Sequence, residues 1–130
     1  MSKRGSPSDV ELQVLAVLWE RGPSTVREVN KALPDRKKRA YTTVLSLLQG
    51  LEHKDLAGHE TRGKTHIYHA SVSRDQVLQP LMKRMLRHVF GGRASQAMQY
   101  LLADEKVSDS ELKQMRQVIA RYQQQKETGQ

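Results

Sequence analysis

The chain has 130 residues and a formal net charge of +8, so it can form one core or a small core with an assembly module, and it favours a polyanionic partner. The absence of cysteine excludes disulfides, thiolate metal sites and cysteine nucleophiles. No apolar run approaches the roughly 20 residues of a membrane span, and the N-terminus lacks a signal-peptide apolar region, so we expect a cytoplasmic protein without membrane insertion.

Two capping boxes mark the first helices. The box SDVE at 8–11 starts a helix with one apolar side, and Gly22-Pro23 ends it. A second, short helix starts at Ser24 or at Thr25, which opens the capping box TVRE at 25–28, and this helix ends before Pro34. Both helices are amphipathic and predict a small helical core.

The segment 36–53, RKKRAYTTVLSLLQGLEH, joins four consecutive cations to a helix with two different faces. Helical spacing places four apolar residues on one side: Val44, Leu47, Leu48 and Leu51. The opposite side and its flank carry polar residues: Arg39, Thr42, Thr43, Ser46, Gln49 and His53. Short polar side chains suit close approach to a DNA major groove, and the cations suit phosphates. A solvated basic loop is the alternative for the cationic run.

A hairpin is predicted next, with strands at about 56–62 and 64–70. Gly63 can take the positive φ of a tight turn, and Arg62 and Lys64 flank it. Three helices and a hairpin with a basic tip predict a winged helix-turn-helix over residues 1–72. The alternative is that the turn is merely solvated.

Residues 73–130 predict a helical dimerisation domain. Pro80 interrupts its first apolar stripe, so we expect a short turn at 73–78 and a helix starting near Pro80, with a continuous, kinked helix as the alternative. Two more helices follow, and the tail is expected to fray from Gln123. Apolar stripes on short helices favour a homodimer interface. The residues assigned to it are Leu78, Met82, Met85, Val89, Leu101, Leu112, Met115 and Ile119.

Catalytic and metal sites are not indicated. The histidines include His66 and His69, which lie three apart on a predicted strand and so point to opposite faces. Neither an HExxH motif nor a GxSxG or GKS/T motif is present. We therefore expect no enzyme activity, no metal and no cofactor.

Three motifs resemble one known family. GPSTVREVNKAL, RAYTTVLSLLQGLEHKDL and GKTHIYHASVSR are similar, in this order, to the BlaI/MecI/CopY family of penicillinase-type repressors. The resemblance implies a bacterial, homodimeric transcriptional repressor that binds palindromic operator DNA through its winged helix.

The same resemblance, together with the helix faces, defines the expected contacts with double-stranded DNA. The residues expected to contact bases are Thr42, Thr43, Ser46, Arg39 and Gln49. Those expected to contact the backbone, partly through the wing, are Thr25, Lys37, Lys38, Arg62 and Lys64. Threonine suits base contact because its hydroxyl and methyl groups can both meet a base edge.

Two departures limit the resemblance. The copper-responsive branch carries a cysteine cluster, which this chain lacks, so copper sensing by that route is excluded. The β-lactam-responsive branch implies a membrane sensor protease system and cleavage at an Asn-Phe bond, where this chain aligns Tyr100-Leu101. Whether the chain is cut therefore stays open. From a different functional class, a winged-helix adaptor that binds protein would instead need an apolar patch on the exposed face of helix 41–53.

Overall fold

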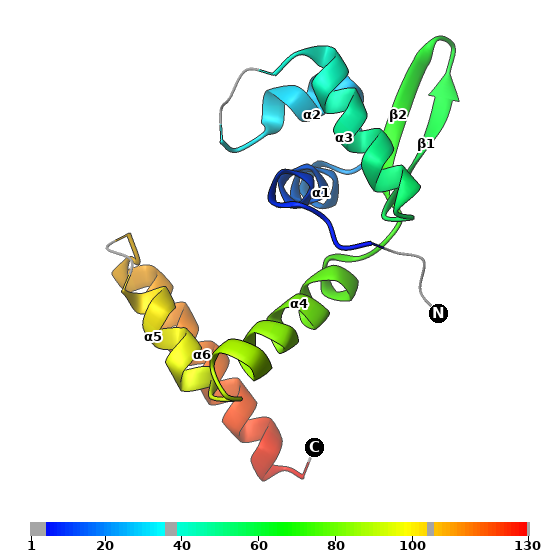
Figure 1. Cartoon of the computed structure of the whole chain (residues 1–130). Coiled ribbons are helices and arrows are strands. Elements are labelled where there is room, and N and C mark those ends of the chain that lie inside the picture. The colour runs from blue at the N-terminus through cyan, green and yellow to red at the C-terminus, as the bar shows by residue number, and fades with distance from the viewer. Residues whose placement is uncertain (1–4, 36–38, 104–105, 130) are drawn as a thin grey trace. The chain divides into compact units, whose positions relative to one another are not determined.

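The computed structural model describes residues 5–35, 39–103 and 106–129 (Figure 1). Its elements are α1 (Asp9–Arg21), α2 (Val26–Ala32), α3 (Tyr41–His53), β1 (Ala57–Arg62), β2 (Thr65–Ala70), α4 (Arg74–Val89), α5 (Ala94–Leu102) and α6 (Asp109–Glu127). The predicted fold class is confirmed: a winged helix-turn-helix followed by helices. The chain divides into two compact units, Met1–Leu81 and Met82–Gln130. Within the described residues, no helix is long and apolar enough to cross a membrane.

Both predicted capping boxes are present. Ser8 accepts a hydrogen bond from the Glu11 amide, and the Glu11 carboxylate accepts one from the Ser8 amide. Thr25 and Glu28 make the same reciprocal pair at α2. These bonds satisfy amides that a helix start leaves without partners.

The core of the first unit lies between α1, α2, α3 and the hairpin. Its buried apolar residues are Val14, Leu15, Val17, Leu18, Val26, Val29, Leu33, Val44, Leu48, Leu51, Leu56, Ala57, Tyr68, Val72 and Val77. The half-buried Trp19 packs against this core and donates its indole hydrogen to the Val72 carbonyl at 2.8 Å. α3 is thus fixed by the same apolar face that its periodicity predicts.

The hairpin is held to the helices by backbone hydrogen bonds. β1 and β2 pair antiparallel, from Ala57 opposite Ala70 to Arg62 opposite Thr65. Each strand begins one residue later than predicted. Ser24, before α2, exchanges two backbone hydrogen bonds with Tyr68 at 2.8 and 2.7 Å. The hairpin runs along α3, and its turn lies toward the start of that helix (Figure 1).

The expectation that a helix starts near Pro80 is wrong: α4 is continuous through Pro80. Ser73 and Gln76 form a reciprocal cap about two turns before Pro80, with bonds of 2.8 and 3.1 Å. Val77 is buried in the core of the first unit, and Leu78 and Leu81 pack against it. The cap and this apolar packing offset the loss of one helical hydrogen bond at proline. The beginning of α4 therefore belongs to the first unit.

The second unit contains the end of α4 and helices α5 and α6. Gly91 and Gly92 have positive φ values of 58° and 82°, and the Gly92 amide donates to the Leu86 carbonyl, which ends α4. The Ser108 side chain caps α6 by accepting from the Glu111 amide. α6 continues to Glu127, so the expected fraying from Gln123 is wrong. Gln, Lys and Glu are good helix formers, and they extend the helix although they bury nothing.

Candidate nucleic-acid interface

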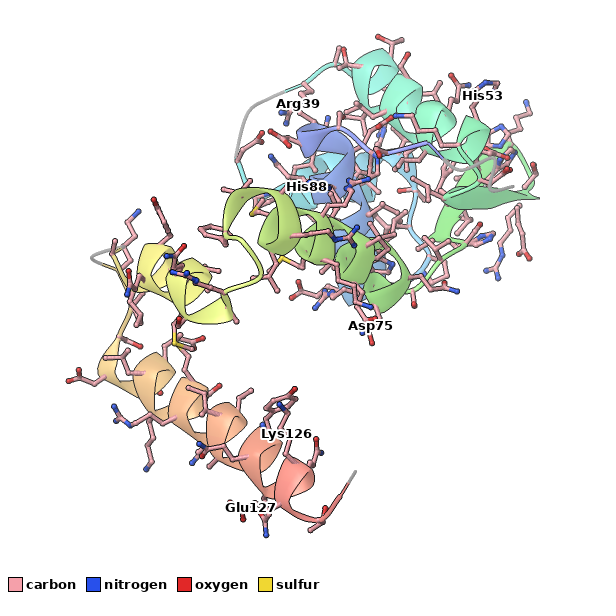
Figure 2. The ribbon with its side chains drawn as sticks, turned by 60° about the horizontal axis from the view of Figure 1, so that its bottom comes forward. Arg39, His53, Asp75, His88, Lys126 and Glu127 are labelled. Carbon is pink, nitrogen blue, oxygen red and sulfur yellow. The ribbon has the colours of Figure 1, made fainter. Side chains whose placement is uncertain are left out.

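Helix α3 presents one buried and one exposed face. Val44, Leu48 and Leu51 are fully buried, as the periodicity predicts, while Leu47 is partly buried. The opposite side leaves four predicted base-contacting residues exposed: Thr42, Thr43, Ser46 and Gln49. Figure 2 shows Arg39 and His53 at the two ends of this helix. The exposed face carries hydroxyls and an amide, which are the groups that read base edges.

Arg39, the fifth predicted base contact, is engaged within the protein. Its guanidinium binds both carboxylate oxygens of Asp35 at 2.9 and 2.6 Å, and its carbonyl accepts from Asn30 at 2.8 Å. The hydrogen bond to Asp35 raises the pKa of Arg39. These bonds fix the segment leading into α3, so Arg39 would have to leave Asp35 to reach a base. Lys37 and Lys38 lie outside the described residues, as does Arg36.

The hairpin turn presents the two predicted wing cations. Gly63 has φ 62° in the two-residue turn, which supports a tight hairpin. Arg62 and Lys64 are exposed beside it, and neither pairs with a carboxylate in the described part of the chain. Two uncompensated cations at a projecting tip form a suitable contact for phosphates.

Thr25 has a structural role at the start of α2. Its hydroxyl oxygen accepts from the Glu28 amide at 3.1 Å, and Glu28 also lies 3.3 Å from Arg21. The hydrogen bond from the Thr25 amide lowers the pKa of Glu28, and Arg21 contributes to the same shift. The hydroxyl hydrogen of Thr25 remains available as a donor to a phosphate.

Three residues that no local sequence pattern singles out share a groove with Thr25 and Lys64. They are Arg27 from α2, Tyr41 from α3 and His66 from β2. The alternation of side chains along β2 places His66 and His69 on opposite faces of the hairpin, as predicted. That His66 lies near α2 and α3 depends on tertiary packing. The described residues contain no group of three His, Cys, Asp or Glu side chains suited to hold a metal.

The residues predicted for dimerisation lie in different environments. Leu78 packs against the core of the first unit. Leu112 and Met115 are half-buried on α6. The other five are exposed: Met82, Met85, Val89, Leu101 and Ile119. Tyr100 and Leu101, at the aligned cleavage bond, are exposed within α5, and the Tyr100 ring lies 5.4 Å from that of Phe90.

Three helices, an antiparallel hairpin with a cationic turn, and an exposed polar face on the third helix define a protein of the winged helix-turn-helix class. The model of the penicillinase repressor family matches residues 7–121. The chain therefore belongs to the penicillinase repressor family.

Individual relatives are similar to this chain over different lengths. The transcriptional regulator BlaI of Mycobacterium tuberculosis is 39% identical over 83 residues, which cover 63% of this chain and 60% of that protein. The penicillinase repressor of Bacillus licheniformis is 22% identical over 119 residues, covering 92% and 93% of the two chains. A solution structure of monomeric Bacillus licheniformis BlaI with the blaP half-operator covers 58% of this chain and 92% of its own, at 27% identity and TM-score 0.47.

Proposed function

We propose that this protein is a transcriptional repressor that binds double-stranded operator DNA as a homodimer. The observation that carries the proposal is the exposed face of α3, where Thr42, Thr43, Ser46 and Gln49 stand opposite a fully buried apolar face. A helix fixed in this way can enter a major groove without disturbing the core. Family membership supports the same function.

Affinity and sequence choice are assigned to different residues. Thr43 and Ser46 offer short hydroxyls for base edges, with Thr42 and Gln49 beside them. Among the described residues, Arg62 and Lys64 have no carboxylate partner, so they suit phosphates, which position the protein on any sequence. Arg39 is better suited to fixing the segment that leads into α3, because Asp35 holds its guanidinium.

Dimerisation is assigned to the second unit, which includes the end of α4, since large apolar side chains are exposed there. Met85 is 53% exposed, Val89 69% and Ile119 41%. Large apolar side chains left exposed commonly mark an interface, and a two-fold dimer would present two copies of α3 to a palindrome. Leu78 contributes to the first unit instead.

Release from DNA by a sensor protease is a separate proposal. Cleavage between Tyr100 and Leu101 would require α5 to unwind locally, because both residues lie inside that helix. Incubation with the protease domain of a neighbouring membrane sensor, followed by mass measurement, tests it. Fragments that end at Tyr100 support cleavage, and an intact chain contradicts it.

A mobility-shift assay with the DNA upstream of the protein's own gene tests repressor function. We expect a discrete complex that survives excess random duplex. The protein-binding adaptor would give no shift even at low salt. The composition of the exposed α3 face, with hydroxyls and an amide in place of an apolar patch, favours the DNA-binding result.

A further inference from the structure

A groove of about 400 Å³ lies where α2, α3 and the hairpin turn meet. Its lining includes Thr25, Arg27, Tyr41, Lys64, Thr65 and His66. Two of these side chains are permanent cations and three carry a hydroxyl. No carboxylate is among the described residues that line the groove. This chemistry fits a singly charged phosphodiester, which needs hydrogen-bond donors and positive charge.

His66, which lines the groove, contacts a second histidine. The His59 ring lies edge-on to it, with the centroids 4.6 Å apart and the planes at 68°. His59 Nδ1 lies 2.8 and 3.0 Å from the carboxylate oxygens of Glu52 on α3. The Tyr68 ring lies 5.1 Å from His59 and 6.4 Å from His66. The Glu52 carboxylate of α3 thus contacts His59, and the His59 ring contacts His66.

The groups around His66 determine how its charge can respond to DNA. Arg27 of α2, Tyr41 of α3 and Lys64 of the turn share the groove with it. His59 of β1 and Tyr68 of β2 face its ring, and Glu52 reaches this cluster through His59. A phosphate in the groove would place a negative charge beside His66, and the described residues that line the groove include no carboxylate. Histidine is the side chain that ordinarily changes charge between pH 5 and 8.

We propose that this groove seats one backbone phosphate of the bound DNA and that His66 takes up a proton from solvent as the phosphate enters. The inference rests on the proposed DNA-binding function and adds a proton linkage to it. Arg27 and Lys64 keep their charge across this pH range, so they supply affinity that does not depend on pH. His59 lies beside the Glu52 carboxylate and is not among the residues that line the groove, so a phosphate there would meet His66 and not His59.

Proton uptake at His66 determines the direction in which DNA affinity changes with pH. A proton taken up on binding makes affinity rise as pH falls, by at most about tenfold per pH unit for each fully linked proton. We expect operator affinity per protomer to rise about threefold to tenfold more in the wild type than in His66→Gln between pH 8 and pH 6. Because the contact is to a phosphate, random duplex should show the same difference.

Calorimetric titration of the full-length protein with its upstream operator duplex tests the proposal, in two phosphate-free buffers of different ionisation enthalpy at pH 7. We expect net proton uptake by the wild type, reduced uptake by His66→Gln, and unchanged uptake by the control His69→Gln on the other hairpin face. Equal uptake by wild type and His66→Gln overturns the proposal, as does loss of uptake only in His59→Gln.

Two further measurements distinguish a proton linkage at His66 from a folding defect and from the binding of free phosphate. Circular dichroism and thermal melting of His66→Gln should match the wild type; a destabilised variant is replaced by His66→Asn, to which the same outcomes apply. Inorganic phosphate in place of DNA should produce at most weak proton uptake, and uptake equal to that with DNA would contradict assignment of the groove to DNA.

If specific binding persists at pH 8 without proton linkage, only this inference fails. Absence of operator binding at every pH instead contradicts the proposed function.

Discussion

The Lys54 ammonium lies 2.6 Å from the carboxylate of Glu11, which joins the end of α3 to the start of α1. Glu11 is buried and also accepts the Ser8 amide at the start of α1, while Lys54 donates to the Ser6 carbonyl at 3.1 Å. This pair connects residues 43 positions apart in sequence. It therefore helps to fix the orientation of the helix proposed to read DNA.

Replacing Glu11 should destabilise the first unit in a pH-dependent way. Burial favours a raised pKa for Glu11, but the hydrogen bonds from Lys54 and Ser8 outweigh it, so the pKa is lowered. Because the pKa of Glu11 is lower in the folded than in the unfolded protein, its ionised carboxylate stabilises the fold fully above the unfolded pKa of about 4.3. This stabilisation is lost as the pH falls through the pKa of the folded state. We expect Glu11→Gln to cost about 1–3 kcal/mol at pH 7 by urea unfolding. If wild type and variant differed in unfolding free energy as much at pH 3 as at pH 7, the assignment would be contradicted.

The effect of Gly50→Ala on the free energy of unfolding should depend on the residue at position 11. A Cβ at Gly50 would lie 2.9 Å from Oε2 of Glu11, whose carboxylate is held by Lys54 and Ser8. In Glu11→Ala this obstacle is absent, and alanine should stabilise the helix by up to about 1 kcal/mol. In the wild type we expect no gain, or a loss. Unfolding of both single variants and the double variant measures the difference, and additive effects would refute the close approach.

The wing cations should contribute affinity without sequence choice. Lys64→Ala should weaken binding to operator and to random duplex by the same factor, because it removes a phosphate contact. The slope of log affinity against log salt concentration should fall by about 0.9. Anisotropy titrations at several salt concentrations measure both quantities. Lys113→Ala, an exposed lysine on α6, is the matched control and should change neither. Loss confined to the operator would instead make Lys64 a base contact.

Assembly should depend on the exposed apolar residues of the second unit. Met85→Lys and Ile119→Lys should each raise the dimer dissociation constant by tenfold or more, because a buried ammonium would lack a partner. Sedimentation equilibrium measures this constant. Gln117→Lys on α6 makes the same change of charge at an exposed polar position and should have little effect. Unchanged association in both apolar variants would move the interface elsewhere.

Local signals explain why much of the fold was predictable. Capping boxes at Ser8 and Thr25 and the spacing of Val44, Leu48 and Leu51 involve neighbours within a few residues, so their outcomes follow from helix geometry. Pro80 was misleading, because the cap at Ser73 and the packing of neighbouring side chains stabilise the helix around it.

The rest depended on contacts between distant segments. The Glu52–His59–His66 cluster requires both the hairpin register and the position of α3, which no local pattern encodes. The pairing of Arg39 with Asp35 lies in the segment before α3, where helical spacing rules do not apply. For this reason the sequence identified the exposed face of α3 but did not show which cations were already engaged.

The central claim is that α3 selects the DNA sequence, and Ser46→Ala tests it most directly. Anisotropy titrations would compare wild type and variant on the upstream operator duplex and on a scrambled duplex at one salt concentration. We predict that operator affinity falls about fivefold or more, the effect of roughly 1 kcal/mol, while affinity for the scrambled duplex is unchanged. Ser95→Ala, an exposed serine on α5, should alter neither. Equal losses on both duplexes, or no loss on either, would contradict the assignment of α3 as the recognition helix.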